Sequence, residues 1–427
     1  MLDSFFPTDI SDSLSEIRLE AKEIFLKKGF PTPRDENWRY TNLRGLKETR
    51  FQNHDQVVSL RNFEGGILLN KKIPVLSIEN GNPKDSQDFQ KKLPGGINCY
   101  KLTDWLKTKE QSFDIPLLIK KSFKNNSISA LNYSCLKEGV VFKISKDCNI
   151  TDPIHIKHLI NCNVSTVVPS VVFIIAEKNA RATFFESHDG VAPETLLATP
   201  ETTFIIDESA FIRHIKTVNQ SSKTYHLGLI NSFQEKDSRL SSTSITYSAQ
   251  ITRHQINANL NDENIDTEFY GLAVPENGQL VDHDLTIEHS HPNCRSWEFF
   301  RGVLIEKTKS AFRGKIHVHE GAHGTDAKQT NQSLLLSDDA DAFSRPQLEI
   351  YADDVKCTHG ATVGQMDQIA LHYLMARGIP RELATSMLVL AFCNEVLEKI
   401  EYEPLKEKAI RLVLNRLPSG SLLTETV

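Results

Sequence analysis

The sequence lacks the cysteine and glycine patterns that mark most structural metal sites and nucleotide sites. Its seven cysteines are scattered, and no two of them form a C-x-x-C pair. A disulfide framework or a zinc ribbon is therefore not expected. Neither G-x-x-x-x-G-K-S/T nor G-x-G-x-x-G occurs, so the usual backbone cradles for nucleotide phosphates are missing. If ATP drives the function of this protein, another chain is expected to supply the ATPase.

Long apolar runs and a strong excess of one charge are also lacking. No stretch approaches the roughly 20 apolar residues of a transmembrane helix, and the first residues lack the basic and apolar regions of a signal peptide. We therefore expect a cytoplasmic protein that does not span a membrane. A net charge of -6 and a pI near 6.2 argue against general affinity for nucleic acid or anionic membranes.

Hydrophobic patterning divides the 427 residues into three regions. Residues 1–126 are predicted to be mostly helical, beginning with an amphipathic helix over residues 13–28. Trp38 and Tyr40, which follow that helix, are expected to pack the helical unit together. Residues 127–360 contain short β-branched and aromatic runs, each closed by a polar turn. Residues 361–427 are predicted to be helical again, with three helices over 366–377, 380–392 and 404–417.

The central β region is long for a single sandwich, because it exceeds 200 residues. A β-helix, by contrast, extends by adding coils that each bury one face on a neighbour. We therefore predict a mainly β fold, with a parallel β-helix core flanked by N-terminal and C-terminal helical regions. No strict sequence repeat supports this prediction.

Two ligands for soft metals lie where the strand-like sequence ends. Cys357 and His359 are two residues apart, so on an extended segment their side chains leave the same face of the backbone. A thiolate and an imidazole suit zinc or an iron-sulfur species, and Lys356 is expected to favour the thiolate. Two ligands cannot close a site, so the others would come from elsewhere in the chain, a second subunit or substrate. Alternatively, Cys357 is a buried small apolar residue and His359 a hydrogen-bonded turn residue.

Histidines are frequent between residues 283 and 323. On a strand His317 and His319 share a face, and His323 could reach them after Gly321 turns the chain. This spacing suggests, as a second hypothesis, a metal-dependent cupin-like enzyme. Such a site also needs a carboxylate and a histidine from another strand, which the sequence does not assign. Along a solenoid, histidines could instead stack in a surface ladder or form hydrogen bonds within turns.

A carbohydrate-active β-helix, either a lyase or a hydrolase, is a third class. Such enzymes cluster acids in the groove of the solenoid and usually carry a secretion signal. Asp338, Asp339 and Asp341 are more typical of a turn, and the signal is absent. This class is therefore disfavoured.

Several short motifs together resemble one family, the SufD component of the SUF iron-sulfur cluster assembly system. Those in the second half of the chain span about 70 residues: Phe312–Ile316, Thr325–Gln329, Leu334–Ser337, Pro346–Ile350, Val355–Thr362 and Tyr373–Ile379. Near the start, Gly29–Pro33 and Glu36–Thr41 are similar to the opening signature of that family. Residues 50–280 match only in length and β character.

This resemblance implies a right-handed parallel β-helix and a non-catalytic scaffold subunit. It implies a heterodimer with the paralogue SufB through the β-helix ends, or a homodimer when the chain is alone. A nascent iron-sulfur cluster would form at the SufB interface with His359, and with Cys357 beside it, as metal ligands; the complex can also bind reduced FAD. The SufC ATPase would dock on the C-terminal helices, for which the candidate residues are Tyr373, Arg377, Leu383, Met387 and Leu388.

SufB is the nearest competitor to SufD within this resemblance. It is usually longer, tends to carry a C-x-x-C cluster near its start, and has an acidic His-Glu motif where this chain has Lys356-Cys357-Thr358-His359. The present sequence departs from SufB in all three respects.

Overall fold

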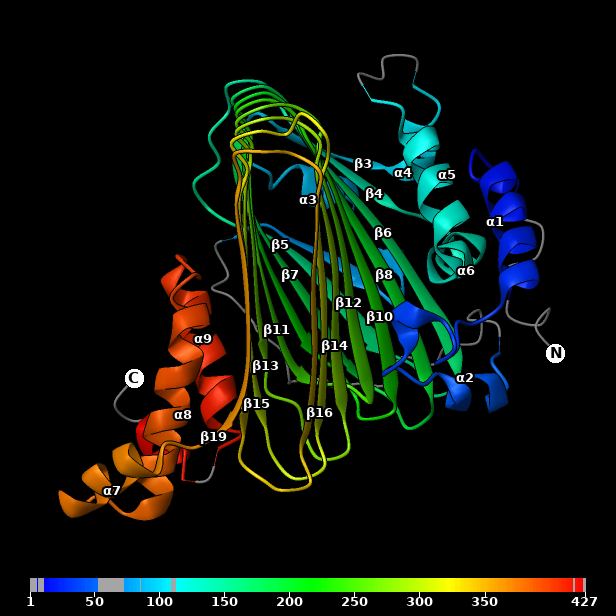
Figure 1. Ribbon diagram of the computed structural model, residues 1–427. Coiled ribbons are helices and arrows are strands. Elements are labelled where there is room, and N and C mark those ends of the chain that lie inside the picture. Colours follow the sequence, from blue (N-terminus) through cyan, green and yellow to red (C-terminus); the bar gives the residue numbers. More distant parts are fainter. Residues whose placement is uncertain are drawn as a thin grey trace.

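The computed structural model describes residues 6, 11–52, 73–84, 86–108, 113–417 and 419–424. Within them the strands form a 10-stranded sheet, called sheet A, and a 9-stranded sheet, called sheet B. From β4 onward, successive strands alternate between the two sheets, and neighbours within each sheet run parallel. Two strands thus make one coil of a parallel β-solenoid (Figure 1). The predicted mainly β solenoid with helices at both ends of the chain is confirmed.

Most strands of the solenoid are ten or eleven residues long. Sheet A contains β1 (Val75–Glu79), β2 (Asn82–Pro83), β5 (Ile154–Asn161), β7 (Arg181–Val191), β9 (Phe211–Asn219), β11 (Arg239–Ser248), β13 (Asp266–Ala273), β15 (Arg295–Leu304), β17 (Asp326–Leu335) and β19 (Lys356–Gln365). Sheet B contains β3 (Ile97–Lys101), β4 (Val140–Ile144), β6 (Thr166–Ala176), β8 (Leu196–Ile206), β10 (Thr224–Gln234), β12 (Ile251–Leu260), β14 (Leu280–His289), β16 (Lys309–Val318) and β18 (Asp341–Ile350).

One turn of each coil contains a residue with positive φ. These residues recur every 27 to 32 positions, and all but one are non-glycine: Asp147, Asn179, Ser209, Asp237, Asn264, Asn293, Gly324 and Asp354. Asn and Asp tolerate this backbone conformation because their short polar side chains form local hydrogen bonds. The backbone N–H of each such residue, up to Gly324, donates to a carbonyl in the same turn of the next coil. The coils therefore repeat in the backbone conformation of this turn, although the residue type at the turn differs from coil to coil.

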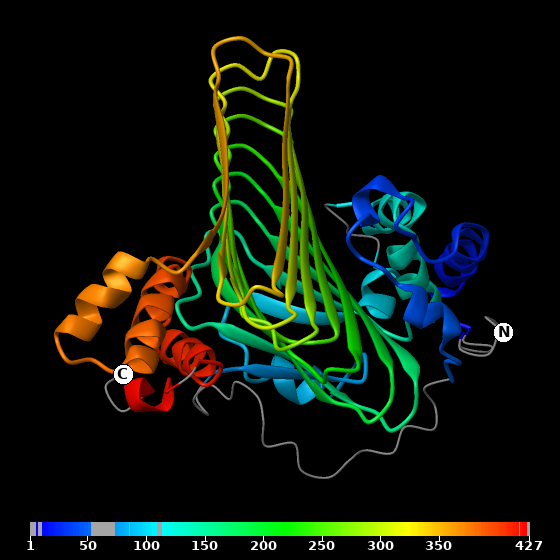
Figure 2. The same ribbon diagram turned by 60° about the horizontal axis from the view of Figure 1, so that its bottom comes forward.

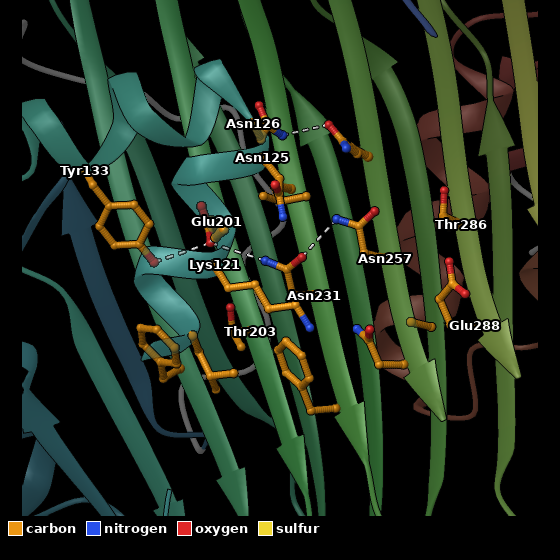
Figure 3. A pocket seen from close by; sticks show the side chains of 18 residues that line it. Lys121, Asn125, Asn126, Tyr133, Glu201, Thr203, Asn231, Asn257, Thr286 and Glu288 are labelled. Atoms are coloured by element: carbon orange, nitrogen blue, oxygen red, sulfur yellow. Dashed lines mark hydrogen bonds between the residues drawn. The ribbon is translucent and has the colours of Figure 1, made fainter. Parts of the chain in front are cut away.

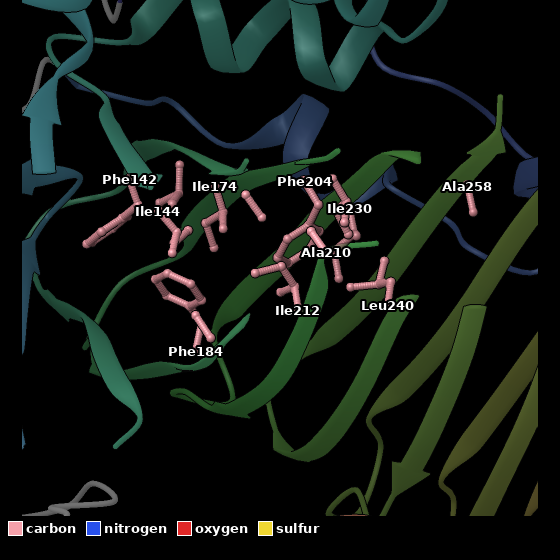
Figure 4. Close-up of a cluster of buried hydrophobic side chains, with 14 of the residues drawn as sticks. Phe142, Ile144, Ile174, Phe184, Phe204, Ala210, Ile212, Ile230, Leu240 and Ala258 are labelled. Carbon is pink, nitrogen blue, oxygen red and sulfur yellow. The ribbon is translucent and has the colours of Figure 1, made fainter. Parts of the chain in front are cut away.

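The space between the two sheets is filled by inward-facing side chains. The apolar part of this interior joins both sheets through residues such as Phe142, Ile174, Phe184, Phe204 and Ile212 (Figure 4). Strand periodicity places alternate residues in this interior, and the remainder face outward, in part toward the flanking helices. The interior is therefore packed rather than hollow along its first coils.

Helices cover part of the outer face of each sheet. On sheet B lie α5 (Ile115–Asn125) and α6 (Ser127–Cys135), with α1 (Ser15–Lys28) packed on α6, and together they bury an apolar cluster with Phe173 and Leu197. On sheet A lie α8 (Arg381–Leu397) and α9 (Glu403–Leu414), packed against Ile245 and Leu272. Figures 1 and 2 show the two helical groups on opposite flanks of the solenoid. The remaining helices are η2 (Glu36–Trp38), α2 (Arg44–Glu48), α3 (Ser86–Gln90), α4 (Leu102–Trp105), α7 (Gln368–Ala376) and α10 (Ser421–Thr424).

The observed elements cross the predicted regional boundaries in places. The first strands of both sheets, β1 and β3, arise within residues 1–126, and α6 begins after residue 126. The structure does not test whether the three regions are separate domains, so that division stays a prediction. Part of the first region, residues 53–72, lies outside the described residues.

Trp38 packs against the apolar cluster of the N-terminal helices, as expected, and both Trp38 and Tyr40 also join the N-terminal segment to the solenoid. The ring of Tyr40 stacks on Phe343 of β18, with ring centroids 4.4 Å apart. Trp38 covers the guanidinium of Arg253 on β12, 4.1 Å from its ring centroid. Arg253 is buried and pairs with the carboxylates of Asp282 and Asp284. The segment around Trp38 therefore shields a buried ionic cluster.

Candidate functional site

Cys357 and His359 lie on β19, the last strand of sheet A. β19 pairs with β17 so that Cys357 is in register with Ala327, and His359 with Gln329. Ala327 and Gln329 are buried side chains of the solenoid interior. Residues in register on neighbouring parallel strands point to the same face. Cys357 and His359 therefore share the inward-facing side of β19, at the end of the solenoid where no further described strand follows.

The two residues differ in exposure. His359 is exposed, whereas Cys357 is half-buried against a small apolar cluster that includes Ile316 and Ala327. Burial raises the pKa of the Cys357 thiol, and the carboxylate of Asp326 acts in the same direction. Any effect of Lys356 in favour of the thiolate is therefore outweighed by burial in the isolated chain. A metal or a partner charge would have to supply that stabilisation.

Directly beneath His359 lies a buried pair of polar side chains. Gln329 is in register with Glu298 of β15, and its amide Nε2 donates to Glu298 Oε2 at 2.7 Å. Burial raises the pKa of the Glu298 carboxyl to about 8, so this group holds its proton at neutral pH. One oxygen of each side chain, Gln329 Oε1 and Glu298 Oε1, has no hydrogen-bond partner among the described residues. Two buried polar side chains, each with one oxygen unpaired in the described part of the chain, therefore lie in the interior next to the last strand.

The structure does not assemble the predicted histidine trio. His317 and His319, on and just after β16, both contact Glu288 of β14, at 2.8 Å from Nδ1 and 2.7 Å from Nε2 respectively. His323 lies apart, with its Nδ1 2.9 Å from the carbonyl oxygen of Asp353. Glu288, His317 and His319 are partly exposed, and the two imidazoles form ordinary His–Glu contacts with the carboxylate. The cupin-like hypothesis is therefore not supported.

A column of buried histidines runs through the solenoid interior, and the sequence analysis missed it. The ring centroids of successive members lie between 4.2 and 5.9 Å apart, in the order His158, His188, His226, His254 and His283. All five are buried. Their positions are separated by 28 to 38 residues, close to the length of one coil, and that spacing is the signal that could have revealed them. Without a register, these histidines cannot be distinguished from surface histidines.

The first two histidines of the column meet a buried carboxylate. Glu186 Oε1 lies 2.8 Å from His188 Nε2 and 3.1 Å from His158 Nε2. Its other oxygen, Oε2, is 3.1 Å from His214 Nε2 and accepts from Thr202 Oγ1 at 2.9 Å. Burial opposes ionisation, but the contacts with the three imidazoles hold the pKa of Glu186 well below its usual range. The carboxylate is therefore ionised inside the solenoid.

A pocket of about 240 Å³ opens on the outer face of sheet B beside α5 and α6. Figure 3 shows side chains of neighbouring strands pointing into it, among them Asn231 and Asn257, whose amides hydrogen-bond at 3.0 Å. Buried Glu201 forms one wall and accepts hydrogen bonds from Ser129, Ser122, Asn231 and Tyr133. Burial raises the pKa of Glu201. This network attaches α5 and α6 to the sheet.

The predicted docking residues lie on α7 and α8 or just after α7. Tyr373, Arg377 and Met387 are exposed, whereas Leu383 and Leu388 are half-buried. Arg377 Nη2 donates to the hydroxyl of Tyr373 at 3.1 Å. Over its described length α7 buries only Leu371, although its sequence is strongly apolar. The outer face of this helix is therefore unusually apolar for a solvent-exposed surface.

The fold and these sites define a class: a parallel β-solenoid with a cysteine and a histidine on its last strand and helices on both flanks. Two family models match almost the whole chain. The SufBD protein N-terminal region matches residues 4–156, and the SufBD core domain of SUF system FeS cluster assembly matches residues 158–392. The chain belongs to the SufBD family of iron-sulfur cluster assembly proteins.

Within this family the chain is SufD-like. It is 27% identical to the iron-sulfur cluster assembly protein SufD of Escherichia coli, over 93% of this chain and 91% of that protein. It is 24% identical to SufD of Bacillus subtilis, over 67% of this chain and 66% of that protein. It is also 24% identical to the chloroplastic protein ABCI7 of Arabidopsis thaliana, over 93% of this chain and 84% of that protein. In the part of the chain that the structure describes, no helix has the length and apolar character needed to cross a membrane.

Proposed function

We propose that this chain is a non-catalytic scaffold subunit of a SUF complex, and that Cys357 and His359 provide metal ligands at its interface with SufB. The observation that supports this most directly is the position of these residues on the terminal strand, facing the open end of the interior. Iron is then the cargo received at the interface. The partner supplies the ligands that this chain lacks.

The open end also provides the surface for the partner. β18 and β19 are the last strands of sheets B and A, and no further strand pairs with their outer edges within the described residues. In Figures 1 and 2 these last coils, in yellow and orange, form one end of the solenoid, where Glu36 and Tyr40 of the N-terminal segment contact Arg345 and Phe343 of β18. Unpaired edge strands favour pairing with strands of another chain. We infer that SufB binds here, and that a second copy of this chain binds here when SufB is absent.

The C-terminal helices are proposed to hold the SufC ATPase. The apolar outer face of α7 supports this assignment, because Ile369 is 83% exposed and Tyr373 is 58% exposed. The chain between β19 and α7 is short, so movement of a bound ATPase would act close to the strand that carries His359. The resemblance also implies reduced FAD in the complex; it stays a prediction with no residue of this chain assigned.

The test replaces His359 with Ala in a strain that depends on the complex for iron-sulfur cluster assembly. Thr358→Ala is the matched control, because Thr358 is the adjacent exposed residue and points to the opposite face of β19. We expect His359→Ala to abolish or strongly reduce cluster assembly while the complex with SufB and SufC still forms. Normal cluster assembly with an intact complex in the His359→Ala strain would refute the proposed role.

A further inference from the structure

We propose that His158, Glu186 and His188 form a binding site for one divalent transition-metal ion of the ferrous class inside the solenoid. These residues lie on β5 and β7, among the first coils, whereas the proposed interface site lies on β19. The inference therefore does not depend on the proposed function of Cys357 and His359.

The three ligand atoms already have the separations of a metal site. His158 Nε2 and His188 Nε2 lie 3.1 and 2.8 Å from Glu186 Oε1, and all three atoms lie within 4.8 Å of one another. With metal-ligand bonds of about 2.1 Å, neighbouring ligands at a right angle are separated by about 3.0 Å. Two imidazoles and one carboxylate form the protein ligand set that non-haem ferrous ions use.

One ligand atom contacts Glu186 without completing a hydrogen bond. His158 Nε2 is buried and has no hydrogen-bond partner among the described residues, although it points within 3.1 Å of Glu186 Oε1. A buried imidazole nitrogen without a partner is costly. A metal ion placed between His158, His188 and Glu186 would provide that partner.

Outer residues hold the ligands in place. His158 Nδ1 lies 3.3 Å from Ser170 Oγ, which leaves Nε2 free to bind a metal when Nδ1 carries the proton. Glu186 Oε2 is fixed by Thr202 Oγ1 and His214 Nε2, so that Oε1 faces the two ligand histidines. Such outer contacts orient metal ligands and raise their affinity.

Burial distinguishes this cluster from the one around Glu288. The side chains of His158, Glu186 and His188 are 6%, 0% and 2% exposed, whereas those of His317, Glu288 and His319 are 21%, 29% and 42% exposed. Water can replace a metal at the exposed cluster, but the interior admits little solvent. An interior ion would enter as the coils close during folding and would then resist chelators.

The test loads the full-length chain with metal during synthesis. Cells expressing the chain are grown with added Co²⁺, which reports its coordination by visible absorption, or with added Fe²⁺ followed by anaerobic purification. The protein is washed with EDTA and its metal content is measured. We expect about one retained ion per chain, with cobalt bands that indicate nitrogen and oxygen ligands.

Glu186→Gln is the main variant, because it keeps the side-chain size and removes the anionic ligand. We expect at least a tenfold loss of retained metal, since even changes outside the first ligands commonly cost that much. Glu288→Gln is the matched control and should retain the ion. If Glu186→Gln lacks the circular dichroism of the folded chain, His158→Gln replaces it. Absence of retained metal from the wild-type chain, equal retention by Glu186→Gln, or loss only in Glu288→Gln would each overturn the proposal.

Discussion

His359 on β19 is the register partner of Gln329 on β17. Gln329 in turn donates to Glu298, so the candidate ligand lies two strands above a buried carboxyl that is protonated at neutral pH. Gln329 Oε1 has no hydrogen-bond partner among the described residues. A polar pair thus lies below the candidate ligand, inside the solenoid.

The protonation of Glu298 predicts a specific pH dependence. Its folded pKa of about 8 exceeds the ordinary value of 4.5, so the folded state retains a proton that the unfolded state loses between those pH values. The free energy of unfolding therefore falls as pH rises through this window, and Glu298→Gln removes that effect. We expect the variant to equal the wild type near pH 4.5 and to gain at most about 1.4 kcal/mol per pH unit up to pH 8.

Urea unfolding at several pH values measures this difference. Glu320→Gln is the control, because Glu320 is exposed. A Glu298→Gln advantage that stays constant from pH 5 to pH 8 would contradict the assignment of a buried, protonated carboxyl.

Local patterns were predictable from the sequence, whereas contacts between coils were not. The amphipathic stripe of residues 13–28 corresponds to α1, and the β-branched run of residues 251–260 is β12. The interior histidines were missed because the coil length varies between 27 and 32 residues, which hides their register. The prediction that His323 joins His317 and His319 was wrong for a related reason. After Gly321 the chain turns toward Asp353 instead of returning to β16. Contacts between residues of different coils can be predicted only when the strand register is known, and residue spacing alone does not give that register.

The buried histidines predict loss of stability in mild acid. Burial lowers the pKa of His155, His283 and His289 to about 3, from an ordinary value of 6.5. Below pH 6.5 the unfolded chain therefore binds protons that the folded chain excludes, and the free energy of unfolding falls as pH decreases toward 3. Each such histidine contributes a loss of about 1.4 kcal/mol by pH 5.5.

His283→Gln should lower by about one the number of protons taken up on unfolding. The free energy of unfolding, measured by thermal or urea unfolding between pH 7 and pH 5, should therefore fall less steeply with decreasing pH. His323→Gln, at an exposed position, should leave the slope unchanged. Identical slopes for His283→Gln and the wild type would show that His283 is protonated in the folded state.

Trp38 is expected to contribute more stability than Trp297, although each ring lies under a cation. The cation over Trp38 is Arg253, which is buried with its two carboxylates, whereas the side chain of Lys328 over Trp297 is 44% exposed. Trp38→Ala would expose the ionic cluster and leave a cavity. Because full burial of a Trp is worth about 3–5 kcal/mol, we expect this partly buried one to cost about 2 kcal/mol. Trp297→Ala should cost less than about 1 kcal/mol. Equal losses in urea unfolding would argue against a shielding role for Trp38.

The apolar face of α7 predicts a variant that separates binding from folding. Ile369 is 83% exposed, so Ile369→Asp removes apolar contact surface without opening a cavity in the core. We expect an unchanged melting temperature and at least tenfold weaker binding of the ATPase partner, measured by titration with purified SufC. His372→Asp introduces the same charge at another exposed position of α7 and serves as the control. If both variants bind SufC as tightly as the wild type, the ATPase docks elsewhere, and the apolar face of α7 requires another partner.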